Sequence, residues 1–219
     1  TLQRMDSSSP TFIETTVHQF RLRDWLAMFW LPYGVGLIYL AVGIWVFWLR
    51  GDHRPGQSFA MFCALVALAT GTLFDISSTH TLTRIWVASL PLTAAALMHV
   101  ALVFPEEGTV IRRWPLVRFV PYPIAAVLVV VSEWRLYAAG DPRAYLPTWR
   151  LNYIVMGLAV VAFFILMLHS RSRTLSPIVR QQVRIILIGS ALAFVPMAIF
   201  LALTGLGVAI RFQDALYLP

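Results

Sequence analysis

The sequence has no lysine and little charge of either sign. Only 12% of its 219 residues are charged, whereas soluble globular domains carry about 25%. All 17 basic residues are arginines. A Schiff base to retinal or pyridoxal phosphate and a Walker-A phosphate loop each require a lysine, so rhodopsin-like light sensing and P-loop ATP hydrolysis are excluded. The scarcity of charge argues equally against a water-soluble fold.

Residues that carry chemistry are also scarce. Cys63 is the single cysteine and lies in an apolar run, so no disulfide or thiolate metal site can form within the chain. The sequence contains no H-E-x-x-H motif and no serine nucleophile elbow. His99 and His169 could in principle face one haem, but nothing in their spacing favours it. We expect no catalytic residue, metal or cofactor here, and the ten acids, which fall in predicted loops, termini and span ends, argue against an ion pump.

Long apolar runs dominate what is present. A helix needs about 20 residues to cross the roughly 30 Å hydrocarbon core of a membrane, and short polar loops between such helices favour an antiparallel arrangement. The sequence therefore predicts an all-α transmembrane protein, an antiparallel bundle of about six spanning helices. The predicted spans are Leu26–Leu49, Ser58–Phe74, Ile85–Phe104, Leu116–Val131, Leu151–Leu168 and Ile185–Ile210.

In the second span, small residues recur on one face of the helix. They are Ala60, Ala64, Ala67 and Gly71. Such a face lets a neighbouring backbone approach closely, as in ordinary bundle packing.

The residues before the first span have a different pattern. The residues of Thr11–Leu22 follow a pattern with a period of two, and many of them are β-branched. Both features predict a strand. We therefore divide the chain into residues 1–24, the end of an extracytoplasmic β-containing domain, residues 25–210, the membrane domain, and residues 211–219, the start of a further span. On this reading the sequence is a fragment of a longer protein at both ends.

Arginine distribution predicts the orientation. Nine arginines fall on the side of the first, third and fifth loops and eight on the other side. The fifth loop, with four arginines and no acid, is the best single indicator of a cytoplasmic location. The N-terminal segment then lies outside. Because the arginines gather at span ends, we expect membrane lipid rather than nucleic acid as a partner.

Four polar residues are candidates for binding or sensing a ligand. Asp75, His80 and Arg84 fall together at the predicted outer end of the second and third spans, although a solvated or ion-paired loop is the simpler explanation for them. His99 lies inside the third span, where an ionisable side chain is costly unless it is paired. A hydrogen bond between helices is the simpler explanation for His99.

Several stretches resemble bacterial sensor histidine kinases of the ComP type. The most specific is H-x-A-L-V-F-P-E-E at His99–Glu107, and the resemblance extends from about Phe20 to Pro219. The other stretches are Phe20–Leu26, Gly43–Arg50, Ser58–Ala64 and Ser176–Arg184. In that family an extracytoplasmic PDZ-like domain commonly precedes a multi-helix membrane sensor, and a last span leads to a cytoplasmic kinase module.

The resemblance implies an input role in the bacterial cytoplasmic membrane. The chain has no phosphoacceptor histidine motif and no ATP lid, so phosphotransfer, ATP binding and the contact with a response regulator would belong to a module outside this chain. The resemblance also implies a homodimer formed through the parent kinase. Two alternatives remain: an accessory subunit of a larger energy-transducing or photosynthetic membrane complex, and a small transporter, which the few intramembrane polar groups disfavour.

A probe placed at Ser172, in the predicted fifth loop, tests the orientation. We expect a reagent that does not cross membranes to leave this probe unmodified in intact cells and to modify it after permeabilisation. Modification in intact cells would invert the topology.

Overall fold

The computed structural model describes residues 2–3, 12–13, 22–104, 109–138 and 142–173, together with residues 181, 184, 187–191 and 194. Two short strands, β1 (Leu2–Gln3) and β2 (Phe12–Ile13), pair antiparallel. The strand predicted over Thr11–Leu22 is thus present at Phe12–Ile13, but Leu22 already begins a helix. The rest of the stretch predicted as a strand lies outside the described residues, and the expected PDZ-like domain stays a prediction.

The remaining regular structure of the described ranges is helical. α1 (Leu22–Trp25) runs through a π-helical turn, η1 (Leu26–Trp30), into α2 (Leu31–Arg50), and α3 (Arg54–Gly71) follows a short connection. The helices that come next are η2 (Phe74–Ser77), α4 (Thr83–Val103), α5 (Thr109–Arg113), η3 (Pro115–Phe119), α6 (Pro121–Tyr137), η4 (Pro142–Tyr145) and α7 (Leu146–Arg173).

Five helical segments in the described ranges are long and apolar enough to cross a membrane, as in a multi-pass membrane protein. They are Leu31–Arg50, Arg54–Ile76, Thr83–Val103, Pro115–Tyr137 and Leu146–His169. Each overlaps one of the predicted spans. Of the sixth, Ile185–Ile210, the structure describes residues 187–191 and 194, which are helical, and the remainder lies outside the described residues.

The fourth and fifth predicted spans imply a short polar loop at Ser132–Arg150 between them, and this prediction is wrong for most of that stretch. α6 continues to Tyr137, and α7 begins at Leu146. The polar residues that marked this stretch as a loop instead occupy the last turns of one helix and the first turns of the next. There, Ser132 and Asn152 are buried against each other, so a helix can carry them.

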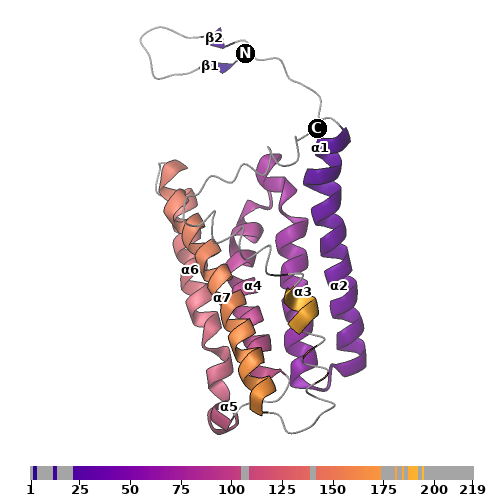
Figure 1. Cartoon of the computed structure of the whole chain (residues 1–219). Coiled ribbons are helices and arrows are strands. Elements are labelled where there is room, and N and C mark those ends of the chain that lie inside the picture. The colour runs from indigo at the N-terminus through magenta and orange to yellow at the C-terminus, as the bar shows by residue number, and fades with distance from the viewer. Residues whose placement is uncertain are drawn as a thin grey trace.

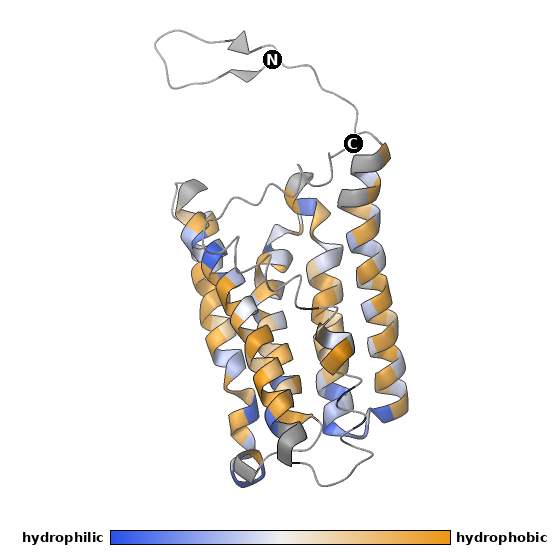
Figure 2. Cartoon of the chain, viewed as in Figure 1, coloured by the Kyte–Doolittle hydropathy of each residue, from blue (hydrophilic) through white to orange (hydrophobic). Residues whose placement is uncertain are grey.

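α4 is the central helix of the bundle. It packs against α3, α6 and α7, whereas α2 packs on the outer side of α3 (Figure 1). In their most apolar stretches, 67% of the residues of α4 are buried but only 11% of those of α2. Figure 2 shows apolar residues along the long helices and hydrophilic residues gathered toward their ends. The exposed apolar side chains of α2 are those that lipid would cover.

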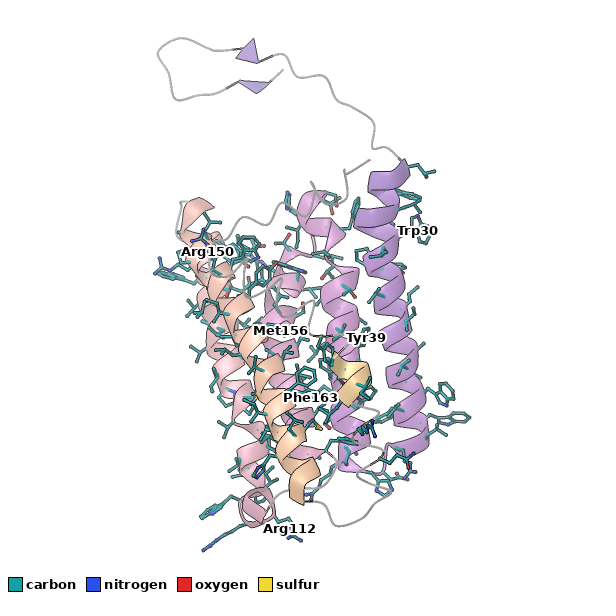
Figure 3. The ribbon with its side chains drawn as sticks, in the orientation of Figure 1. Trp30, Tyr39, Arg112, Arg150, Met156 and Phe163 are labelled. Atoms are coloured by element: carbon teal, nitrogen blue, oxygen red, sulfur yellow. The ribbon has the colours of Figure 1, made fainter. Side chains whose placement is uncertain are left out.

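The helices place polar groups at two opposite ends of the bundle. We call them the Asp75 end, where α3 leads into α4, and the Arg50 end, where α2 leads into α3. Arg150 lies at the Asp75 end and Arg112 at the Arg50 end (Figure 3).

Two glycines set the distance between α2 and α3. A Cβ atom placed on Gly43 would lie 2.7 Å from the Cβ of Cys63, and one on Gly36 would lie 2.6 Å from Oγ1 of Thr70. The carbonyl oxygens of Ala60 and Ala67 lie almost as close to these two positions. The small-residue face expected on the second span therefore receives the backbone of α2 at Ala60 and Ala67.

We expect Gly43→Val to force α2 away from α3. Overpacking of this kind costs about 1–3 kcal/mol, so the unfolding temperature in detergent should fall. Gly34→Val is the matched control, because a Cβ atom at Gly34 meets nothing within 4 Å. Equal stability of the two variants would contradict the close packing described here.

Candidate functional site

Asp75 holds the connection between η2 and α4 together. Its carboxylate accepts hydrogen bonds from the backbone N–H groups of Thr81 (3.2 Å) and Leu82 (2.7 Å) and from the hydroxyl groups of Thr79 and Thr83. These hydrogen bonds fix the loop that leads into α4, although the first turn of the helix itself has no side-chain cap. Asp75 is 9% exposed. Its oxygen atoms are engaged by its own loop.

His80 and Arg84 do not join Asp75 in one cluster. His80 is exposed and has a left-handed backbone with φ of 57°, and its N–H donates to the Asp75 carbonyl oxygen at 3.0 Å. Arg84 extends toward α6, where it lies 3.9 Å from the Glu133 carboxylate and 4.4 Å from the centre of the Tyr137 ring. At 71% side-chain exposure, this ion pair contributes little to stability.

A buried polar group between α6 and α7 lies beside this pair. Nδ2 of Asn152 donates to Oγ of Ser132 at 3.0 Å, and both side chains are fully buried. Oδ1 of Asn152 and the hydroxyl of Tyr145 are buried without a hydrogen-bond partner in the described part of the chain. The pKa of Tyr145 is raised, mainly by burial. Its phenol is therefore neutral and able to donate a hydrogen bond.

His99 is placed in the half of α4 that lies toward the Arg50 end. Its Nδ1 lies 3.0 Å from the hydroxyl of Tyr122 on α6, and that hydroxyl lies 3.8 Å from Sδ of Met61 on α3. The imidazole also packs edge-on against Phe119 at 5.3 Å. The expected hydrogen bond between helices is therefore present at His99, and it ties α4 to α6. A sensing role for His99 stays a prediction.

A cavity in the described structure lies between α2, α3, α4, α7 and a last segment that contributes Gly189, Ser190 and Phe194. Its volume is about 800 Å³, within the range of about 300–1,000 Å³ typical of small-molecule sites. We call it the aromatic cavity. Its aromatic lining residues are Tyr39, Phe59, Phe62, Phe104, Phe163 and Phe194. Arg50 and His53 line it where α2 leads into α3.

Ring contacts join the walls of the aromatic cavity. Phe62 lies edge-on to Tyr39 at 6.3 Å and to Phe194 at 6.0 Å. Phe194 in turn lies edge-on to Phe163 at 6.1 Å. Figure 3 shows Tyr39 on α2 and Phe163 on α7 near the middle of the bundle. These rings therefore pack α2, α3, α7 and Phe194 against one another.

The structure separates the four candidate residues. Asp75, His80 and Arg84 lie at the Asp75 end of the bundle. His99 lies on α4, in the half of that helix toward the Arg50 end. In the described ranges, no three His, Cys, Asp or Glu side chains are grouped so that they could hold a metal ion. The aromatic cavity was not predicted, because its lining comes from five separate segments, and only the repeated phenylalanines of successive spans could have indicated it.

Comparisons with known proteins add no assignment. No protein-family model matches the chain, and neither a curated protein nor a solved structure matches it.

The hydrogen bonds of Asp75 predict a stability effect. Asp75→Asn keeps the shape of the side chain but replaces one accepting oxygen and the charge. We expect the unfolding temperature to fall, because hydrogen bonds to a charged group are stronger than neutral ones. Thermal unfolding in detergent measures this change, with Asp52→Asn, an exposed acid at the Arg50 end, as the control. Equal unfolding temperatures of the two variants would show that the Asp75 carboxylate contributes nothing.

The Ser132–Asn152 pair predicts a coupling between two substitutions. Ser132→Ala alone leaves the buried Asn152 amide without its acceptor and should cost about 1 kcal/mol. Ser132→Ala combined with Asn152→Leu should cost less than the sum of the two single variants. Strict additivity in a double-mutant cycle of unfolding free energies would refute the pairing, and Ser78→Ala provides an exposed serine control.

Proposed function

We propose that this chain is the multi-span membrane input domain of a two-component sensor histidine kinase in the bacterial cytoplasmic membrane. It relays a signal across the membrane to a kinase module outside the chain. The observation that supports the proposal most is the aromatic cavity, about 800 Å³ in volume and lined by four spanning helices together with Gly189, Ser190 and Phe194. The choice of family is based on the sequence stretch His99–Glu107, which resembles such kinases.

A cavity between helices provides a means of signalling. A ligand shifts an equilibrium only by contacting two packings of the protein differently. An occupant of the aromatic cavity would touch α2, α3, α4, α7 and the segment that carries Gly189 and Phe194 at once. A change in the position of that last segment would be the output, since it continues toward the C-terminus of the chain.

The two ends of the bundle have different roles in this proposal. The Asp75 end is held by the hydrogen bonds of Asp75 to its own loop and by the buried Ser132–Asn152 pair between α6 and α7, so it acts as a firm support. The Arg50 end bears Arg112 and Arg113 and is placed in the cytoplasm, as the positive-inside rule favours. Movement is then concentrated around the aromatic cavity.

The outward face of α2 is the observation that favours the second candidate function, that of an accessory subunit. Trp45 is 63% exposed and Trp48 84% exposed. These rings would pack against another protein if the chain were an accessory subunit of a larger energy-transducing or photosynthetic complex. A lipid environment explains the same exposure without a partner, so we prefer the input domain.

The full-length gene product tests the proposal. We expect the reading frame to continue past Pro219 into a further span and a kinase core, and we expect the purified protein in nanodiscs to autophosphorylate. Gly189→Leu, which adds a side chain at a glycine that lines the cavity, should change the rate by about fivefold or more. Gly34→Leu is the matched control, since a Cβ atom meets nothing within 4 Å at either glycine.

Two results would overturn the proposal. One is a stop codon directly after Pro219 together with co-purification in a stoichiometric complex, which selects the accessory subunit. The other is an active kinase on which Gly189→Leu and Gly34→Leu have the same effect.

A further inference from the structure

We propose that the aromatic cavity binds a single-chain anionic amphiphile, a fatty acid, with its carboxylate at Arg50 and His53 and its acyl chain between the aromatic side chains. This inference names a ligand class for the cavity on which the proposed function rests. It depends on three features of the cavity: its lining, the charge at one end and the position of that charge along the helices.

The lining divides into an apolar body and a basic end. Phe62, Leu97, Val100 and Phe163 surround the body. The side chains of Arg50 and His53 are exposed and line the cavity at the α2–α3 connection. The described lining includes no carboxylate. A ligand that matches this pattern has a long apolar part and a single anionic group at one end.

Arg50 provides the chemistry for a carboxylate. A guanidinium presents a planar array of donors that pairs with both oxygens of a carboxylate. Arg50 is the last residue of α2 and Gly51 follows it, so its side chain lies at the level where a membrane-spanning helix meets the headgroups. A lipid-derived anion would therefore have its charged group at its usual depth while its chain entered the bundle.

The ring contacts explain why a flexible chain fits better than a rigid planar ligand. Tyr39, Phe62, Phe194 and Phe163 meet edge-on, so ring edges and faces alternate along the wall. An acyl chain adapts to such a surface by rotating about its single bonds. A flat ring system would need two parallel faces, and the rings of this series lie at interplanar angles of 80–87°.

Direct binding of radiolabelled palmitate to the full-length protein in nanodiscs tests the inference. We expect saturable binding that weakens about fourfold for each methylene removed from the chain, as the burial of apolar groups requires. Arg50→Gln should weaken binding about tenfold. Arg112→Gln, an exposed arginine at the same end that does not line the cavity, should leave binding unchanged.

Competition identifies the chemical class of the occupant. Hexadecanol, which has the chain without the charge, should compete about tenfold more weakly than palmitate, and Gly189→Leu should abolish binding while Gly34→Leu preserves it. The inference is overturned if palmitate does not saturate, if hexadecanol competes equally, or if a two-chain phosphatidylglycerol or a quinone displaces palmitate at lower concentration.

The readouts separate this inference from the proposed function. Palmitate binding that leaves autophosphorylation unchanged would refute signalling through the cavity and keep the ligand class. A kinase that responds to Gly189→Leu but does not bind palmitate would refute the ligand class and keep the input domain.

Discussion

Burial of α4 by three other helices is the constraint on which the rest of the structure depends. Most of a helix in that position is buried, so each polar side chain in its buried part needs a partner on a neighbouring helix or on its own backbone. His99 meets Tyr122, and Thr93 donates to the carbonyl oxygen of Ser89 at 2.7 Å. The same burial leaves α2 as an outer helix, attached mainly to α3 through Gly36 and Gly43.

These contacts make the two ends of the bundle different: pairs of polar side chains hold the Asp75 end, and a cavity lies toward the Arg50 end. At the Asp75 end, polar side chains of α4, α6 and α7 meet in pairs, and the Asp75 carboxylate fixes the start of α4. Toward the Arg50 end, aromatic side chains enclose a space of about 800 Å³ beside two basic residues. A ligand that enters there encounters walls joined by ring contacts rather than by directional hydrogen bonds. Such walls repack at lower cost, which suits an input domain.

The sequence was sufficient for the spanning helices but not for their contacts. Apolar runs identified five spans, because a membrane requires a fixed length of apolar helix. The last turns of α6 were missed, since Ser132 looks like a loop residue until Asn152 of the next span supplies its partner. Asp75, His80 and Arg84 are close in sequence, yet Arg84 extends to α6, a contact that only the packing of α4 determines. The cavity depends on five segments at once, so no local pattern could predict it.

Lipid-phase labelling of the unmodified protein tests the central place of α4 most directly. A photoactivated carbene reagent dissolved in the bilayer modifies side chains that face lipid, and mass spectrometry locates them. The account predicts strong labelling of α2 at Ile44, Trp45 and Trp48, and protection of α4 from Ala94 to Leu97, where every residue is at most 4% exposed. Labelling of α4 as heavy as that of α2 would contradict it.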